Sequence, residues 1–138
     1  MVDVKLAPGA EEVAMAVMIS DMIKANLENP AKLKDFNKLK ARVFINAKDA
    51  ETEMTMLFDK GSLTVYGGKE GKPDISIITD AATLLDLANI NIKFGMPYYF
   101  DETGMAVVKK LLKGELKLKG MFTHYFALNR LTKIMSLN

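Results

Sequence analysis

The spacing of apolar residues predicts two helices in the first third of the chain. Between residues 10 and 27, apolar side chains recur every three or four positions, as on one face of an amphipathic helix. Asn29 and Pro30 are residues typical of a helix cap and of the first helical position. We therefore expect a first helix over residues 10–27 and a second, shorter helix from residue 30 to about residue 40.

From Arg42 onward the pattern changes to alternating apolar and polar residues, which indicates strands with one buried face. Turn sequences rich in glycine at residues 59–61 and 67–73 separate these strands. Consecutive strands joined in this way favour an antiparallel meander with one face exposed to water. The alternation predicts four strands, over residues 42–46, 51–58, 63–66 and 75–77.

In the last third of the chain, the pattern of apolar residues predicts helices before and after a fifth strand. Thr79 or Asp80 is expected to cap a helix that frays near Asn89, and residues 91–101 lack periodicity, so we expect a packed loop there. A helix capped within residues 101–103 should then end at Gly114, a residue that adopts the left-handed conformation at low cost.

The segment after Gly114 alternates apolar and charged residues at Leu116 and Leu118, which predicts the fifth strand. After Gly120, a C-terminal helix carries Leu128, Leu131 and Met135 on one stripe. The whole pattern predicts a single α+β domain over residues 1–138, with a five-stranded sheet covered on one face by about five helices.

Composition narrows the functional classes. The chain has no cysteine, which excludes disulfides, thiolate catalysis and cysteine metal sites. Its longest apolar run, residues 13–19, is too short to span a membrane, and the acidic residues before it are unlike a signal peptide, so a cytoplasmic protein is the simplest expectation. A net charge of +2 argues against general nucleic-acid binding.

The charge is unevenly distributed along the chain. Residues 30–48 carry six basic residues and one acidic residue, and residues 105–120 carry five lysines and one glutamate, for net charges of +5 and +4. The rest of the chain is therefore at −7. Basic segments on an acidic body suit anionic lipid headgroups or a phosphate-bearing ligand, although solvated lysines beside apolar stripes give the same pattern.

Three segments together resemble the sterol carrier protein 2 family. They are FDKGSLTVYGG at residues 58–68, PDISIITDAATLLDLA at residues 73–88, and LLKGELKLKG at residues 111–120. The resemblance implies a mostly antiparallel five-stranded sheet with an apolar tunnel between sheet and helices. It further implies non-catalytic binding of sterols, fatty acids or acyl-CoA, and related domains serve as accessory or oligomerising modules.

Methionines are the first candidates for a ligand-binding wall. Met15 and Met22 lie on the apolar face of the first helix, Met54 and Met56 share one strand face, and Met105 follows the cap of a later helix. Methionine is unbranched and polarizable, so a methionine-rich wall adapts to acyl chains of different shape. The same residues would also serve simply to fill a core.

His124 is the only histidine, and an ideal helix places it in the middle of the C-terminal apolar stripe. It is either a buried, hydrogen-bonded neutral imidazole or a polar anchor for a ligand headgroup. Phe126 projects from the opposite side of that helix. It would close a tunnel mouth, touch a membrane or form a dimer contact, unless the helix begins irregularly and buries it.

From the sequence we therefore expect a non-catalytic lipid carrier without cofactor or metal. Its partners would be a lipid or acyl ligand and transiently an anionic membrane surface. A homodimerising interaction module without a small ligand is the first alternative, and an enzyme that uses His124 on acyl substrates is the second. The expected ligand-binding residues are Met15, Met22, Met54, Met56, Met105, Leu112, His124 and Phe126.

Overall fold

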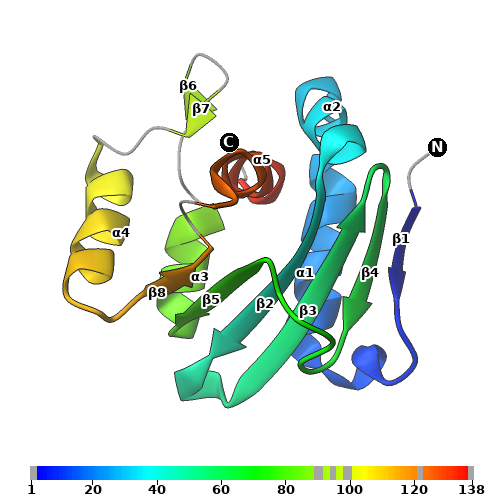
Figure 1. Ribbon diagram of the computed structural model, residues 1–138, viewed down its shortest axis with the longest axis horizontal. Helices are drawn as coiled ribbons and strands as arrows, with labels where there is room; N and C mark the ends of the chain where they lie inside the picture. The colour runs from blue at the N-terminus through cyan, green and yellow to red at the C-terminus, as the bar shows by residue number, and fades with distance from the viewer. Residues whose placement is uncertain (1–2, 89–91, 94–95, 98–100, 121–122, 137–138) are drawn as a thin grey trace.

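The computed structural model describes residues 3–88, 92–93, 96–97, 101–120 and 123–136 (Figure 1). Within these residues the helices are α1 (Ala14–Asn26), α2 (Pro30–Lys38), α3 (Ala81–Ala88), α4 (Glu102–Leu112) and α5 (Tyr125–Met135), with short 3-10 turns at Ala10–Glu12 and Lys48–Ala50. The strands are β1 (Asp3–Leu6), β2 (Lys40–Ala47), β3 (Thr52–Asp59), β4 (Ser62–Tyr66), β5 (Ile75–Thr79), β6 (Ile92–Lys93), β7 (Met96–Pro97) and β8 (Lys117–Lys119).

The main sheet is six-stranded and mixed, with the order β1-β4-β3-β2-β5-β8. The predicted meander β2-β3-β4 is antiparallel, as is β5-β8, whereas β1 pairs parallel with β4 and β5 parallel with β2. The prediction of five mostly antiparallel strands is therefore wrong in number and partly in direction. The sixth strand, β1, is set by its parallel pairing with β4, a distant segment of the chain that local alternation does not identify. Residues 67–74 carry the chain back to the other side of the meander, where β5 joins β2 (Figure 1).

Two local predictions also need correction. The first helix is interrupted, because a 3-10 turn precedes α1 and Val13 between them is extended. The loop expected over residues 91–101 contains a two-stranded sheet, in which Ile92 and Lys93 pair with Pro97 and Met96. The rest of that loop lies outside the described residues, at positions 91, 94–95 and 98–100, and so does the expected fraying at Asn89. Asp101, the last residue of the loop, is described and caps α4.

One face of the sheet forms the core, as the alternation predicts. Val43 and Ile45 on β2 and Met54, Met56 and Phe58 on β3 are fully buried, and α1 packs against β3 and β4 on this side. On the opposite face the turn after β4 covers part of the sheet. There the buried Thr55 hydroxyl donates to the carbonyl of Gly68 and accepts from the amide of Glu70, at 2.7 and 3.0 Å.

Predicted caps and glycines occupy the places expected of them. The side chains of Asn29, Asp80 and Asp101 each accept a backbone amide at the start of α2, α3 and α4. Gly114 and Gly120 have φ of 78° and 82°. A Cβ atom on Gly120 would lie 2.0 Å from the carbonyl oxygen of Asp74, so only glycine fits where β8 leaves the sheet.

The C-terminal end of α5 is held by side chains from the first two helices. Asn26 donates to the carbonyls of Ile134 and Ser136, at 3.0 and 3.1 Å, and the buried Lys32 donates to the carbonyl of Lys133. These bonds satisfy carbonyls that a helix end otherwise leaves without partners. Burial lowers the pKa of Lys32, and neighbouring Asp35 acts in the opposite direction.

Replacing Asn26 with alanine should destabilise the protein, because two buried carbonyls lose their donor. We expect the free energy of unfolding to fall by about 1–3 kcal/mol, measured by urea denaturation. The exposed Asn37 on α2 provides the matched control, and Asn37→Ala should change stability by less than about 0.5 kcal/mol. Equal effects of the two substitutions would contradict the role of Asn26.

Candidate functional site: an apolar cavity between α4, α5 and the sheet

A cavity of about 220 Å³ lies where α3, α4 and α5 meet the β5-β8 side of the sheet. Among the described residues the lining is almost wholly apolar, and none of the lining residues is charged. In this part of the chain, the polar side chains of the lining are Tyr125, Asn129 and Thr132. The lining consists of Ile77, Leu84, Val107, Val108, Leu111, Leu118, Tyr125, Leu128, Asn129, Leu131, Thr132 and Met135.

Strand pairing builds one wall of the cavity. Ile77 on β5 stands opposite Leu118 on β8, so both side chains project from the same face of the sheet. Alternation along β8 directs Lys117 and Lys119 to the other face. The short basic strand therefore contributes one apolar side chain to the cavity and two exposed lysines outside it.

Helical spacing builds the other walls. Val107, Val108 and Leu111 lie within one turn of α4, and Leu128, Leu131 and Met135 follow the predicted stripe of α5. Asn129, also on α5, is buried, and its amide nitrogen Nδ2 has no hydrogen-bond partner among the described residues. Among the described lining residues, Asn129 is therefore the one whose buried side-chain donor has no hydrogen-bond partner.

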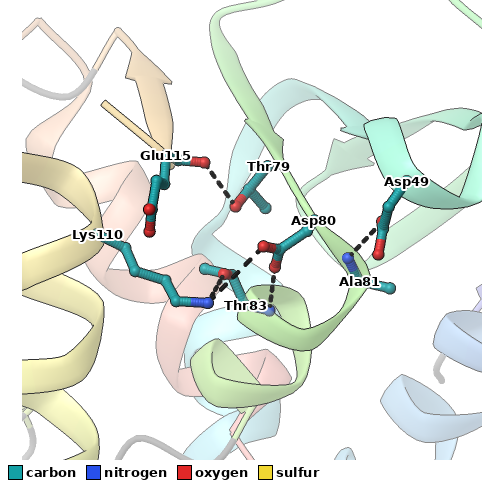
Figure 2. A network of polar contacts seen from close by, with 7 residues as sticks. All are labelled: Asp49, Thr79, Asp80, Ala81, Thr83, Lys110 and Glu115. Carbon is teal, nitrogen blue, oxygen red and sulfur yellow. Dashed lines mark hydrogen bonds and ion pairs between the residues drawn. The ribbon is translucent and has the colours of Figure 1, made fainter. Parts of the chain in front are cut away.

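A polar network joins α4 to the start of α3 (Figure 2). The Nζ atom of Lys110 donates to Oγ1 of Thr83 at 2.7 Å and lies 3.7 Å from Oδ2 of Asp80. Oδ1 of Asp80 accepts the backbone amide of Thr83 at 2.7 Å, which caps α3. Lys110 thus fixes one wall of the cavity relative to its neighbour.

The same network reaches the sheet and the 3-10 turn before β3 (Figure 2). The hydroxyl of Thr79 donates to the carbonyl of Glu115 at 3.1 Å, and the amide of Ala81 donates to Oδ1 of Asp49 at 2.9 Å. These bonds tie β5, the chain before β8 and the start of α3 together on one side of the cavity.

The sequence-predicted site residues lie outside the cavity lining. Met54 and Met56 are fully buried on β3, and Met15 and Met22 are half-buried on α1 against the core. In the sheet, β2 separates β3 from β5, so the methionines of β3 are two strands away from Ile77. Alternation identifies the buried face of a strand but does not give the position of the strand in the sheet. The prediction that these methionines contact a ligand stays a prediction.

Met105, Leu112 and Phe126 lie on the helices that line the cavity but are exposed, by 38%, 81% and 76%. On α4, the face that bears Met105 and Leu112 is different from the one that buries Gly104 and Val107. Whether these three side chains contact a ligand also stays a prediction.

His124 is not buried in the middle of the α5 stripe, so this expectation is wrong. It precedes the first residue of α5 and is half-exposed, because the helix begins at Tyr125 and not directly after Gly120. Its Nε2 lies 3.7 Å from Oδ1 of Asp74, and its Nδ1 lies 3.1 Å from the hydroxyl of Thr123. It does not line the cavity.

The sequence pattern identifies cavity residues on α3, α4 and β8 as apolar, although it does not bring them together as a site. Leu84, Val107, Leu111 and Leu118 belong to apolar faces that the periodicity identifies. Their meeting point depends on how the helices pack, which periodicity does not give. Tyr125 and Asn129 carried no signal that distinguishes them from other polar residues of α5.

The family comparison identifies the chain. The model of the SCP-2 sterol transfer family matches residues 20–95, more than half of the 138 residues. The chain therefore belongs to the SCP-2 sterol transfer family. This confirms the family that the sequence motifs resemble.

Two solved structures share the fold. One is described as a UbiJ-SCP2 ubiquinone synthesis protein, with a TM-score of 0.60, 18% identity, and coverage of 87% of this chain and 90% of the other. The second is sterol carrier protein 2, with a TM-score of 0.51, 14% identity, and coverage of 83% and 87%. A comparison with curated protein sequences finds no match.

Within the described part of the chain, no helix has the length and apolar character needed to cross a membrane. The same residues bring no three histidine, cysteine, aspartate or glutamate side chains together as metal ligands.

The Asp80 network should make stability depend on pH in the acid range. Hydrogen bonds from Thr83, and secondarily the positive charge of Lys110, hold the pKa of Asp80 below its ordinary value of 3.8. A lowered pKa in the folded state stabilises the protein above pH 3.8, and this stabilisation is lost as pH falls through the folded pKa. Asp80→Asn should therefore reduce the free energy of unfolding at pH 7, and the difference from wild type should shrink below pH 3.8.

Urea denaturation across this pH range measures the effect, with Asp21→Asn at an exposed position of α1 as the control. A difference between wild type and Asp80→Asn that is the same at every pH would contradict the electrostatic role.

Proposed function

We propose that this protein binds a fatty acid, an acyl-CoA or a similar single-chain lipid in the α4-α5 cavity and carries it without changing it chemically. The observation that supports this proposal is the apolar cavity between sheet and helices in a member of a sterol transfer family. The described lining residues offer burial for a hydrocarbon chain and no charged group for a headgroup.

The size of the cavity sets how a ligand would be held. Its volume of about 220 Å³ exceeds the roughly 150 Å³ that accommodates benzene, but is below the range of about 300–1,000 Å³ typical of pockets for larger ligands. We infer that the cavity holds one end of the chain and that longer ligands displace α4 outward. The ionised headgroup then lies outside, where α4 carries exposed lysines.

Burial of apolar area gives the expected strength of binding. A chain that hides about 300 Å² gains roughly 7 kcal/mol at about 25 cal/mol per Å², before the entropic costs of association. This gain is below the roughly 8 kcal/mol of a micromolar complex, so binding by the hydrocarbon chain alone would be weaker than micromolar and readily reversible, as transfer requires. The cytoplasmic location expected from the sequence stays a prediction, which cell fractionation would test.

The exposed apolar side chains favour one alternative function, a dimerising interaction module. Leu112 and Phe126 are among the most exposed large apolar residues of the described chain and would suit a protein interface. A stable dimer at nanomolar concentration, without any bound small molecule, would favour this alternative.

Non-catalytic binding is part of the proposal. Thr123, His124 and Asp74 cluster outside the cavity, and the His124–Asp74 separation of 3.7 Å is too long for a hydrogen bond. We expect no thioester hydrolysis above background with acyl-CoA. Hydrolysis that disappears in His124→Ala would identify an enzyme.

Native mass spectrometry of protein purified without detergent tests the carrier function directly. We expect a stoichiometric adduct of lipid mass, identified after solvent extraction. In titrations of delipidated protein with fatty acids of increasing length, each methylene should strengthen binding by up to about 0.8 kcal/mol until the cavity is filled. The panel includes ubiquinone, because one structural neighbour is described as a ubiquinone synthesis protein. Protein that remains without adduct and responds to none of these ligands would refute the proposal.

Filling the cavity should abolish ligand binding without unfolding the protein. Leu128 is a partly buried lining residue, so Leu128→Trp adds bulk where the cavity leaves room. We expect affinity for a fluorescent fatty acid to fall at least tenfold, or about 1.4 kcal/mol. Met18→Trp, at an exposed residue of α1 outside the cavity, is the matched control and should bind normally. Normal binding by Leu128→Trp would place the ligand elsewhere.

A further inference from the structure

Exposed apolar side chains are concentrated on the two helices that line the cavity. In the described part of the chain, five large apolar side chains are exposed, and four of them belong to α4 and α5. The fifth, Met18, lies on α1. We call these four residues the α4-α5 apolar surface: Met105, Leu112, Tyr125 and Phe126.

On both helices, these exposed residues lie next to residues that line the cavity. Met105 and Leu112 are seven residues apart and therefore lie on one side of α4, with Val108, a lining residue, between them. Tyr125 is half-exposed and also lines the cavity, and its ring meets the edge of Phe126 at a centroid distance of 5.6 Å. In Figure 1, α4 lies at the periphery of the molecule, where a flat partner could reach it.

Positive charge accompanies the apolar side chains. Lys109 and Lys113 are exposed and follow Met105 and Leu112 around α4. Apolar side chains that insert between lipids, flanked by lysines that meet anionic headgroups, are the features of a helix that binds at a membrane interface.

We propose that the α4-α5 apolar surface docks on an anionic lipid bilayer and brings the cavity to the membrane, from which the ligand enters. The inference rests on the proposed function, because docking on a membrane supplies the cavity with ligand only if the cavity binds lipid. The lysines favour a bilayer over a second copy of the chain. A two-fold dimer through this surface would bring Lys109 and Lys113 of both copies close together, which is repulsive.

Vesicle flotation tests the docking surface. Wild-type protein should float with vesicles of phosphatidylcholine containing about one-third phosphatidylglycerol, and much less with pure phosphatidylcholine. Raising the salt from about 0.1 M to about 0.5 M should weaken binding, because the lysine contribution is screened. Leu112→Gln/Phe126→Gln should lower the vesicle partition coefficient at least about tenfold. Met18→Gln removes an equally apolar exposed side chain elsewhere and should bind vesicles as wild type does.

Further variants separate docking from ligand binding. Lys109→Gln/Lys113→Gln should lose most of the binding to anionic vesicles and largely keep the wild-type melting temperature, because both side chains are exposed and glutamine puts no negative charge at the C-terminus of α4. Leu128→Trp should float normally although its cavity is filled, and wild-type protein should bind the fluorescent fatty acid in solution without vesicles. Failure of the fatty-acid assay alone would refute the proposed function and leave the docking result standing.

Three outcomes would overturn the docking proposal. The first is wild-type protein that does not bind anionic vesicles. The second is surface variants that float with vesicles as wild type does. The third is a dimer of wild-type protein in solution that dissociates in Leu112→Gln/Phe126→Gln. The last outcome, seen by light scattering, would assign the surface to a second copy of the chain.

Discussion

The cavity depends on how the last turn of α5 is bonded to the first two helices. Asn26 and Lys32 donate to carbonyls of the α5 C-terminus across more than 100 residues of sequence. Asp35 adds ion pairs to Lys133 and Arg130, at 3.1 and 3.8 Å. Because α5 supplies six of the twelve lining residues that the structure describes, these contacts set the position of a large part of the cavity wall. The N-terminal helices thereby shape a site to which they contribute no lining side chain.

Much of the fold follows from local patterns in the sequence. The caps at Asn29, Asp80 and Asp101, the meander and the left-handed Gly114 were all predictable, since each depends on a few neighbouring residues. β1, β6 and β7 were not predictable. β6 and β7 have two residues each, too few for alternation to register, and β1 is set by its parallel pairing with β4, a distant segment of the chain.

The site was less predictable than the fold, for a different reason. Met54 and Met56 were correctly assigned to a buried strand face, yet β2 lies between their strand and β5. Met105 and Leu112 lie on a helix that lines the cavity, but their side chains are exposed. The side-chain chemistry of methionine suggests an adaptable wall, whereas strand order and helix rotation decide which residues form it. His124 shows the same limit, because one irregular turn before α5 removes it from the apolar stripe.

The edge strand β8 has a consequence for how copies of the protein meet. An exposed sheet edge offers unpaired backbone groups that invite strands from other molecules. β8 has only three residues, and two of them are lysines. A strand from a second copy could therefore form few backbone hydrogen bonds with β8, and its own lysines would be repelled. A protein that carries exposed apolar side chains next to a sheet edge is at risk of aggregation. Here the shortness and charge of β8 protect the edge closest to those side chains from growth into a larger sheet.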